Sequence, residues 1–274
     1  MDKDPVVHTA RASWLQPGWR RVALLATTML STFAVPAFAQ TLPTGGAYVA
    51  GSGSIGTAGP AMTIDQSTNR GIINWQGFSI GAANQVQINN GAGATLNRVT
   101  GGNLSTIAGQ LGATGSVYLV NPNGVVVGPG GKVLTGGSFV ASTRDVPNDQ
   151  FMGGGTLTFA GTSNGTVANA GAIASQNGDV VLIGQAASNS GTISAPNGTA
   201  ALAAGNQVLL AAGNGPAGIY VAPDVTATGD ATNTGAIKAA AAALASAGGN
   251  VYALAGNRGG LIQATGTKTI AGQV

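Results

Sequence analysis

The sequence predicts an all-β fold in which short strands stack as a solenoid. Asn-Ala-Gly-Ala-Ile at 169–173 recurs as Asn-Ser-Gly-Thr-Ile at 189–193 and as Asn-Thr-Gly-Ala-Ile at 233–237, a period of about twenty residues. Glycine contributes 46 of the 274 residues and charged residues only 7%, a composition unlike that of ordinary disordered chains. A repeat of this length cannot bury its own apolar side, so neighbouring repeats must stack to form a core.

Stacked repeats place equivalent residues in columns. Successive turns of such a solenoid lie about 4.8 Å apart, and each backbone group pairs with the turns above and below it. Valine, isoleucine, leucine and alanine fill the narrow interior, while glycine and asparagine take the corners, where backbone angles are unusual. We therefore expect the recurring asparagines to form a hydrogen-bonded ladder along one corner.

The N-terminal segment differs from the rest and is typical of a secretory signal peptide. A long basic region precedes an apolar run over 22–38, which ends in the small-x-small pattern Ala37-Phe38-Ala39. We predict a signal peptide over 1–39 with cleavage between Ala39 and Gln40. A membrane anchor is the alternative, but the apolar run is short for a bilayer span and contains Pro36.

Removal of the leader leaves few groups for catalysis or metal binding. The remaining chain has seven Lys and Arg, six Asp, and no His, Cys or Glu, so its net charge is +1. No basic patch indicates nucleic acid, and the usual general bases, nucleophiles and soft-metal ligands are missing. The aspartates share no spacing that indicates a joint site; they are Asp65, Asp145, Asp149, Asp179, Asp224 and Asp230.

The first part of the remaining chain is expected to cap the solenoid. Small polar residues and glycines dominate 41–69, with short strands predicted at 48–50 and 62–64. The segment 72–80 is strand-like on both sides of a glycine. Within it, Trp75 is expected to anchor the core or the cap rather than to stack on a ligand.

Two apolar strands meet at one polar corner near the middle of the chain. Val117 to Val120 alternate as in a strand, and a second apolar run follows at 125–127. Between them lies Asn121-Pro122-Asn123-Gly124. Proline lacks an N–H and is excluded from a central strand, and Asn-Gly tolerates positive φ, so turn chemistry predicts a β-turn here.

Two later segments depart from the repeat. The region 142–155 is the most charged part of the chain and is expected to project from the body as a loop or hairpin. Arg144 beside Asp145 is interpreted as a solvated pair of little energetic value. The alanine-rich stretch from Ala239 to Ala247 interrupts the last repeat, and the sequence leaves open whether it is a helical turn or a flat insertion.

Several motifs in this order resemble the N-terminal secretion (TPS) domains of filamentous haemagglutinin-like proteins of two-partner secretion. The resemblance covers about 41–208 and rests on segments that begin at Trp75, Val86, Asn97, Ser105, Val117 and Phe139. It implies a single-stranded right-handed parallel β-helix with an N-terminal cap and an extra-helical loop or hairpin. The secretion domain then spans 40–274, with 209–274 a candidate for the start of a longer passenger.

The resemblance also implies a function and a partner. The protein is expected to be an exported adhesin of the haemagglutinin type, which passes through the periplasm of a Gram-negative cell. POTRA domains of a dedicated outer-membrane barrel would bind it, and it would fold outside, secreted or on the cell surface, with a receptor or glycan as its target in virulence. In the family, Asn-Pro-Asn-Gly is needed for efficient secretion, a role that falls on Asn121, Pro122, Asn123 and Gly124. The second Asn-Pro-Asn-Leu motif of some members is absent.

Two other function classes compete with this interpretation. A β-helical polysaccharide-active enzyme needs carboxylates clustered along one groove, whereas the aspartates here are scattered. A haem-binding secreted protein would need axial ligands, and without His or Cys the candidates are Tyr48, Tyr118, Tyr220 and Tyr252. A spectral titration with haem would separate that class. We predict no catalytic residue, no metal and no cofactor.

Overall fold

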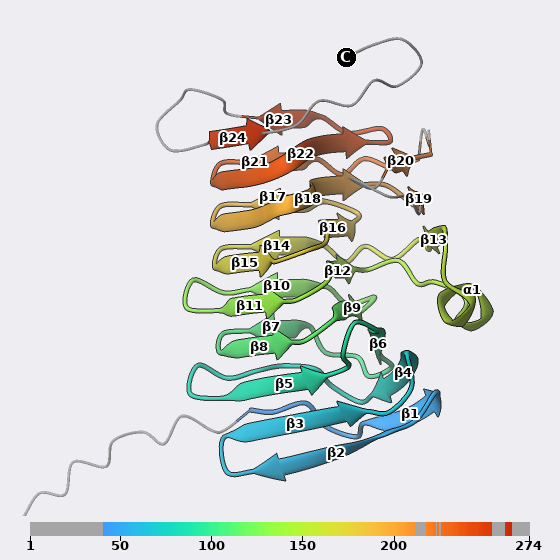
Figure 1. Ribbon diagram of the computed structural model, residues 1–274. Coiled ribbons are helices and arrows are strands. Elements are labelled where there is room, and N and C mark those ends of the chain that lie inside the picture. The colour runs from blue at the N-terminus through green and yellow to red at the C-terminus, as the bar shows by residue number, and fades with distance from the viewer. Residues whose placement is uncertain (1–40, 212–217, 223, 225, 254–260, 265–274) are drawn as a thin grey trace, which may run out of the picture. The chain divides into compact units, whose positions relative to one another are not determined.

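The computed structural model describes residues 41–211, 218–222, 224, 226–253 and 261–264, with side chains up to 250. The predicted signal peptide and its cleavage site lie outside these residues. The described strands wind turn upon turn into a parallel β-helix, with one short helix beside it (Figure 1). The predicted fold class is confirmed.

Three walls of parallel strands form the β-helix. The first wall contains β3 (Ala61–Gln66), β5 (Gln85–Asn89), β8 (Gln110–Ala113), β11 (Lys132–Thr135) and β15 (Ala172–Ser175). The second contains β4 (Arg70–Trp75), β6 (Ala94–Val99), β9 (Ser116–Val120), β12 (Phe139–Ser142) and β16 (Val180–Gly184). The third contains β7 (Ser105–Ile107), β10 (Val125–Val127), β14 (Val167–Asn169), β17 (Ala187–Asn189), β21 (Ala231–Asn233) and β23 (Val251–Ala253). The long strands β18 (Thr192–Ala204) and β22 (Ala236–Ser246) pass through the first two walls, and β24 (Leu261–Ala264) pairs with β22.

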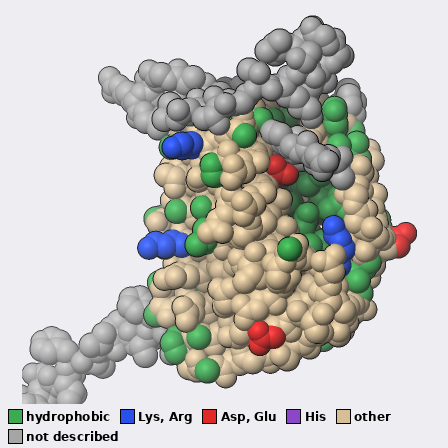
Figure 2. Space-filling view, in the orientation of Figure 1, with side chains coloured by type: hydrophobic (Ala, Val, Ile, Leu, Met, Phe, Trp, Pro, Cys, Tyr) green, Lys and Arg blue, Asp and Glu red, His purple; other side chains and the backbone are tan. Residues whose placement is uncertain are grey.

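The register between turns produces the predicted apolar columns. In the first wall, Val133 lies beside Ile173, which lies beside Ile193 and then Ile237, and all of them are buried. Burial of such side chains stabilises the fold by about 1.5–3 kcal/mol each. The described part of the face shown in Figure 2 is mostly uncharged, in line with the few charged residues in the sequence.

The recurring asparagines form the ladder that the repeat predicts. The Asn169 side-chain amide donates to Asn189 Oδ1 over 2.7 Å, and the Asn189 amide donates to Asn233 Oδ1 over 2.7 Å. All three side chains are buried. Buried amides of this kind stabilise the corner only while each has its partner.

We expect Asn189→Ala to lower the free energy of unfolding by about 2 kcal/mol, because it leaves the amides on both sides without one partner. Urea titration of the variant measures this loss. Asn177→Ala is the matched control, since Asn177 is an exposed corner asparagine that donates to the Gly136 carbonyl over 3.2 Å. Equal losses in the two variants would show that the ladder adds nothing.

An antiparallel cap forms the N-terminal end. β1 (Ala47–Ala50) runs antiparallel to β4, and β2 (Gly53–Ala58) forms a hairpin with β3. The expected strands in this segment are therefore present. Trp75 is 1% exposed, donates its indole N–H to Asn97 Oδ1 over 3.1 Å and meets the Phe78 ring edge-on, which confirms it as a core anchor.

A second layer covers the outer face of the second wall. It consists of α1 (Asn148–Gly153), β13 (Leu157–Ala160), β19 (Gln207–Ala211) and β20 (Gly218–Val221), and the three strands form their own antiparallel sheet. Buried Phe151 and Phe159 flank Tyr118 of β9, while the Arg70 guanidinium lies over the Phe151 ring at 5.1 Å. β12 and β16 beneath this layer are buried at every residue, which explains their largely apolar sequences.

Both irregular segments differ from expectation in part. The projecting region does leave the β-helix, but it contains the short helix α1 where a loop or hairpin was expected. The stretch from Ala239 to Ala247 is not a helical turn. Most of it belongs to β22, where Ala241 to Ala245 pair with Thr199 to Ala203 of β18. It is a copy of the preceding turn with a shortened corner, since only Ala240 replaces the three residues 196–198.

Candidate functional site

The motif Asn121-Pro122-Asn123-Gly124 forms the corner between β9 and β10. The Gly124 N–H donates to the Asn121 carbonyl over 3.0 Å, which closes a β-turn as predicted. The Asn121 N–H donates to the Ser142 carbonyl of the next turn, and the Gly124 carbonyl accepts from Ser105 of the preceding one. The corner is therefore held from above and below.

The side chain of Asn121 is fully buried and fully engaged. Its Nδ2 donates to the Asn103 carbonyl over 2.9 Å and to Ser105 Oγ over 2.8 Å. Its Oδ1 accepts from the Asn123 N–H over 2.9 Å. An asparagine amide offers two donors and one acceptor oxygen, and each has a partner here. In the folded protein, Asn121 has no polar group left for a ligand.

The next two residues of the motif face solvent. Pro122 and Asn123 are exposed, and Asn123 Nδ2 donates to the Gly101 carbonyl over 2.9 Å and to Asn121 Oδ1 over 3.1 Å. Leu104, 45% exposed, lies beside the turn. The corner thus presents a proline, an amide and a leucine, without a titratable group.

Gly124 is required at its position for two reasons. Its φ of +116° is a backbone conformation that residues with a side chain rarely adopt. A Cβ at this position would also lie 2.8 Å from Leu104 Cδ1 and 3.1 Å from the Thr166 carbonyl oxygen. The turn therefore depends on glycine for both backbone angle and space.

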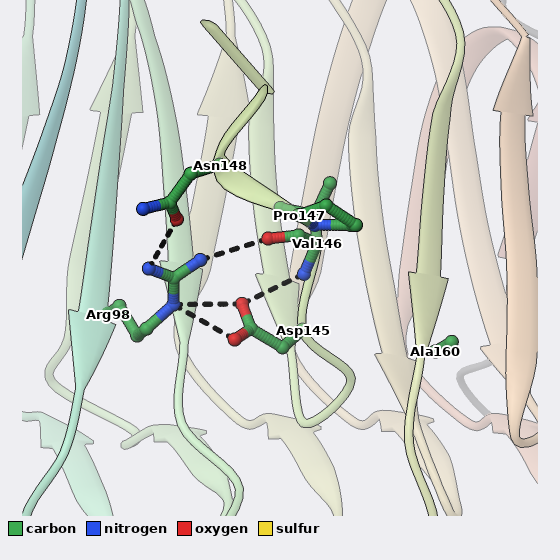
Figure 3. Close-up of a pocket in the computed structure, with 6 residues that line it drawn as sticks. All are labelled: Arg98, Asp145, Val146, Pro147, Asn148 and Ala160. Atoms are coloured by element: carbon green, nitrogen blue, oxygen red, sulfur yellow. Dashed lines mark hydrogen bonds and ion pairs between the residues drawn. The ribbon is translucent and has the colours of Figure 1, made fainter. Parts of the chain in front are cut away.

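Figure 3 shows a shallow pocket beside α1, which is organised by Arg98. Its Nε lies 2.9 Å from Asp145 Oδ2, and its terminal nitrogens donate to Asn148 Oδ1 over 2.8 Å and to the Val146 carbonyl over 2.9 Å. Pro147 and Ala160 complete the lining of a hollow of about 440 Å³. Each guanidinium nitrogen already has a partner, so Arg98 holds the start of α1 against β6 rather than a ligand.

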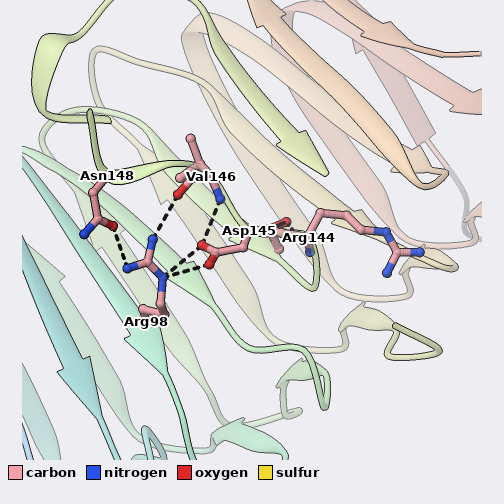
Figure 4. Close-up of polar contacts among 6 residues, drawn as sticks. Arg98, Arg144, Asp145, Val146 and Asn148 are labelled. Carbon is pink, nitrogen blue, oxygen red and sulfur yellow. Dashed lines mark hydrogen bonds and ion pairs between the residues drawn. The ribbon is translucent and has the colours of Figure 1, made fainter. Parts of the chain in front are cut away.

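Arg144 does not form the solvated pair with Asp145 that the sequence suggested; Asp145 pairs with Arg98 instead, and Figure 4 shows the Arg144 side chain extending away from both. Arg144 is fully buried. Its Nε donates to the Gly205 carbonyl over 2.8 Å, and its two terminal nitrogens reach the Ser163 carbonyl over 2.7 Å and Asn206 Oδ1 over 3.1 Å. Burial lowers the pKa of the guanidinium from its usual value.

The structure also separates the other candidate ligands. Among the described residues, no three acidic side chains meet in a group that could hold a metal ion. Tyr48, Tyr118 and Tyr220 come from β1, β9 and β20, and burial raises the pKa of the first two. The side chain of Tyr252 is outside the described set. Within the described residues, no helix has the length and apolar character needed to cross a membrane.

Sequence reasoning missed the residues that hold the turn from neighbouring repeats. Ser105 and Asn103 lie sixteen and eighteen residues before Asn121. One signal was present, because a register of about twenty residues places the segment before β7 beside this corner. Nothing in the sequence indicates that the Asn121 amide donates to a serine hydroxyl and to a backbone carbonyl.

Comparison with known proteins gives a family match and several relatives. The family described as TPS secretion domain matches residues 39–274. Two proteins of Haemophilus influenzae named heme/hemopexin-binding protein are 38% identical over 139 residues and 40% identical over 92 residues. The crystal structure of the HMW1 secretion domain from Haemophilus influenzae is similar with a TM-score of 0.63 and 30% identity, covering 74% of this chain and 57% of that one.

The two curated matches cover only a small part of the relatives' own lengths. The two heme/hemopexin-binding proteins match 49% and 33% of this chain but only 15% and 10% of their own lengths. The similarity therefore concerns one region of much longer proteins. The likeness to the HMW1 secretion domain extends to three-dimensional structure as well as to sequence.

Proposed function

The chain belongs to the family of TPS secretion domains, TPS standing for two-partner secretion, and on that basis we propose that it directs its own export through a dedicated outer-membrane transporter. Proteins of this family are exoproteins that cross the outer membrane by the two-partner route. The family match over residues 39–274 is the observation that carries the proposal. The likeness to the HMW1 secretion domain supports it.

The finer steps of this route belong to the proposal. The leader over 1–39, cleaved between Ala39 and Gln40, takes the chain into the periplasm, where POTRA domains of the transporter bind it. An unfolded strand offers free N–H and C=O groups that suit addition to a sheet edge of such a domain. Outside, each completed turn serves as the template for the next, and burial of apolar side chains opposes backsliding.

The corner formed by Asn121, Pro122, Asn123 and Gly124 is proposed as the secretion motif. The exposed Pro122 and Asn123 and the fully engaged Asn121 support two separable contributions. In the folded state Asn121 holds the turn, whereas Asn123 is exposed and its side chain bonds only to the Gly101 carbonyl and Asn121 Oδ1. The role proposed for Asn123 is therefore contact with the transporter before the chain folds. The exported protein is proposed to act as an adhesin without enzymatic activity, with a receptor or glycan as its target.

The test is export with and without the transporter. Co-expression with an outer-membrane barrel partner is expected to place the protein in the medium, and omission of the partner is expected to abolish this. Asn121→Ala and Asn123→Ala should each lower the exported amount several-fold. Asn177→Ala, at another exposed corner, is the matched control and should be exported normally. Partner-independent release, or normal export of both motif variants, would refute the proposal.

Haem binding is a second candidate because of the names of the Haemophilus influenzae relatives. The shared region is a small part of those proteins, so their names do not assign haem to it. The candidate axial ligands Tyr48, Tyr118 and Tyr220 lie on three different strands, β1, β9 and β20. We therefore favour secretion as the function of this region.

A further inference from the structure

The N-terminal end of the β-helix leaves one strand edge open. β2 pairs with β3 and, within the described residues, with no other strand. Figure 1 shows β2 as the last strand at this end of the stack. All of its residues are exposed except Ile55, which is partly buried. An exposed strand of this kind offers unpaired backbone groups to another strand.

The hairpin register identifies the unpaired groups. The Ser67 N–H donates to the Ser52 carbonyl over 2.9 Å, which makes these residues a hydrogen-bonded pair at the base of the hairpin. Such pairs alternate along antiparallel strands, and β2 and β3 pair without a register shift. The N–H and C=O groups of Gly53, Ile55 and Thr57 therefore point away from β3.

β2 carries none of the side chains that usually protect an edge. Natural edge strands are shielded by lysine, proline, a bulge or a covering segment. β2 reads Gly-Ser-Ile-Gly-Thr-Ala, without charge or proline. A Cβ placed on Gly56 would meet nothing within 4 Å, so the space beside it is open. Asp65 of β3 is the charged residue that faces this strand, and its Oδ1 accepts a hydrogen bond from the Asn89 side-chain amide over 2.7 Å.

The end of one core column is also incomplete. Ile88 lies beside Ile64, and both are fully buried. Ile64 in turn pairs with Ile55, which packs on the core but stays partly exposed. The apolar column of the first wall thus ends at Ile55, and no other strand within the described residues continues it.

We propose that β2 pairs antiparallel with β2 of a second copy of this chain and forms a two-fold symmetric dimer. The axis passes between the two Ile55 residues, so Gly53 of each copy faces Thr57 of the other. These pairs join the open backbone groups in about six hydrogen bonds. The two Ile55 side chains then meet, and the isoleucine column continues from one copy into the other.

A second copy fits this edge because the strand is complementary to itself. The same axis places Ser54 opposite Gly56, so no charges or bulky side chains oppose each other. The contact is limited to one strand edge, which is small for a stable dimer. Association is therefore expected to be weak and to depend on concentration.

Cysteine cross-linking tests the register directly, because the chain contains no Cys. The two residues of a hydrogen-bonded antiparallel pair have Cα atoms about 5.5 Å apart, within the range of a disulfide. Ile55→Cys should form a disulfide-linked dimer on oxidation. Thr57→Cys is the control, since Thr57 faces Gly53 rather than itself. Equal cross-linking of the two variants, or none at Ile55→Cys, would overturn the proposal.

A pair of double variants tests the same register without cross-linking. Ser54→Lys with Gly56→Lys places lysines opposite each other in the dimer, whereas Ser54→Lys with Gly56→Asp places lysine opposite aspartate. Sedimentation of the wild type should approach twice the monomer mass as concentration rises. The lysine variant should associate about tenfold more weakly, and the lysine–aspartate variant should recover. A wild type that stays monomeric, or two variants that behave alike with intact circular dichroism, would refute the dimer.

Discussion

Arg144→Ala is expected to lower the free energy of unfolding by about 3–5 kcal/mol. The guanidinium joins the end of β12 to the Ser163 carbonyl, the Gly205 carbonyl and Asn206 Oδ1. These acceptors belong to segments that connect the second layer to the β-helix. Without the arginine they stay buried with fewer partners, and a cavity opens beside them. Urea unfolding followed by circular dichroism measures the loss.

Two further substitutions separate hydrogen bonding from packing. Arg144→Met keeps most of the apolar stem, so it should remain nearly as destabilised as Arg144→Ala if the hydrogen bonds dominate. Lys132→Ala removes an exposed cation from the first wall and should change stability by less than about 0.5 kcal/mol. Recovery of most of the stability in Arg144→Met would show that Arg144 acts mainly by filling space.

The role of Arg144 could not be predicted from the sequence because its partners are distant along the chain. Gly205 and Asn206 lie 61 and 62 residues after it. The adjacent Asp145 offered a local partner, but that carboxylate turns to Arg98, 47 residues earlier. The local charge pattern predicts an ion pair between adjacent residues. In a solenoid, however, residues one or more turns apart along the chain lie side by side.

The repeating part of the fold could be predicted because it follows one rule. Asn169, Asn189 and Asn233 recur at the period of the solenoid, and the structure stacks them in register. Trp75 was assigned to the core because a large apolar ring gains most from burial. These predictions needed only the period and the chemistry of each residue.

The second layer does not follow the repeat, so its structure could not be predicted from a period. α1 is a single short helix within a region of mixed composition, and its buried Phe151 pairs with Tyr118 of a distant strand. The alanine-rich part of β22 carried helix-forming residues in a strand position. Pairing with β18 decides its conformation, because tertiary contacts override weak local preference.

Asn121→Ala is expected to lower the free energy of unfolding by about 3 kcal/mol, whereas Asn123→Ala should cost less than about 1 kcal/mol. Asn121 is fully buried, and its loss leaves the Asn103 carbonyl, Ser105 Oγ and the Asn123 N–H without their partner. Asn123 is exposed, so water replaces its side-chain bonds. Urea unfolding of both variants measures the difference.

Measuring export of the same two variants then separates folding from recognition. Asn121→Ala should lose stability and export together, because the corner it holds is part of the fold that retains the chain outside. Asn123→Ala should lose export while its stability stays near that of the wild type, since its exposed side chain adds little to the fold and its proposed role is contact with the transporter before folding. Normal export of Asn123→Ala beside poor export of Asn121→Ala would assign the whole motif to folding. The transporter would then have to recognise another part of the chain.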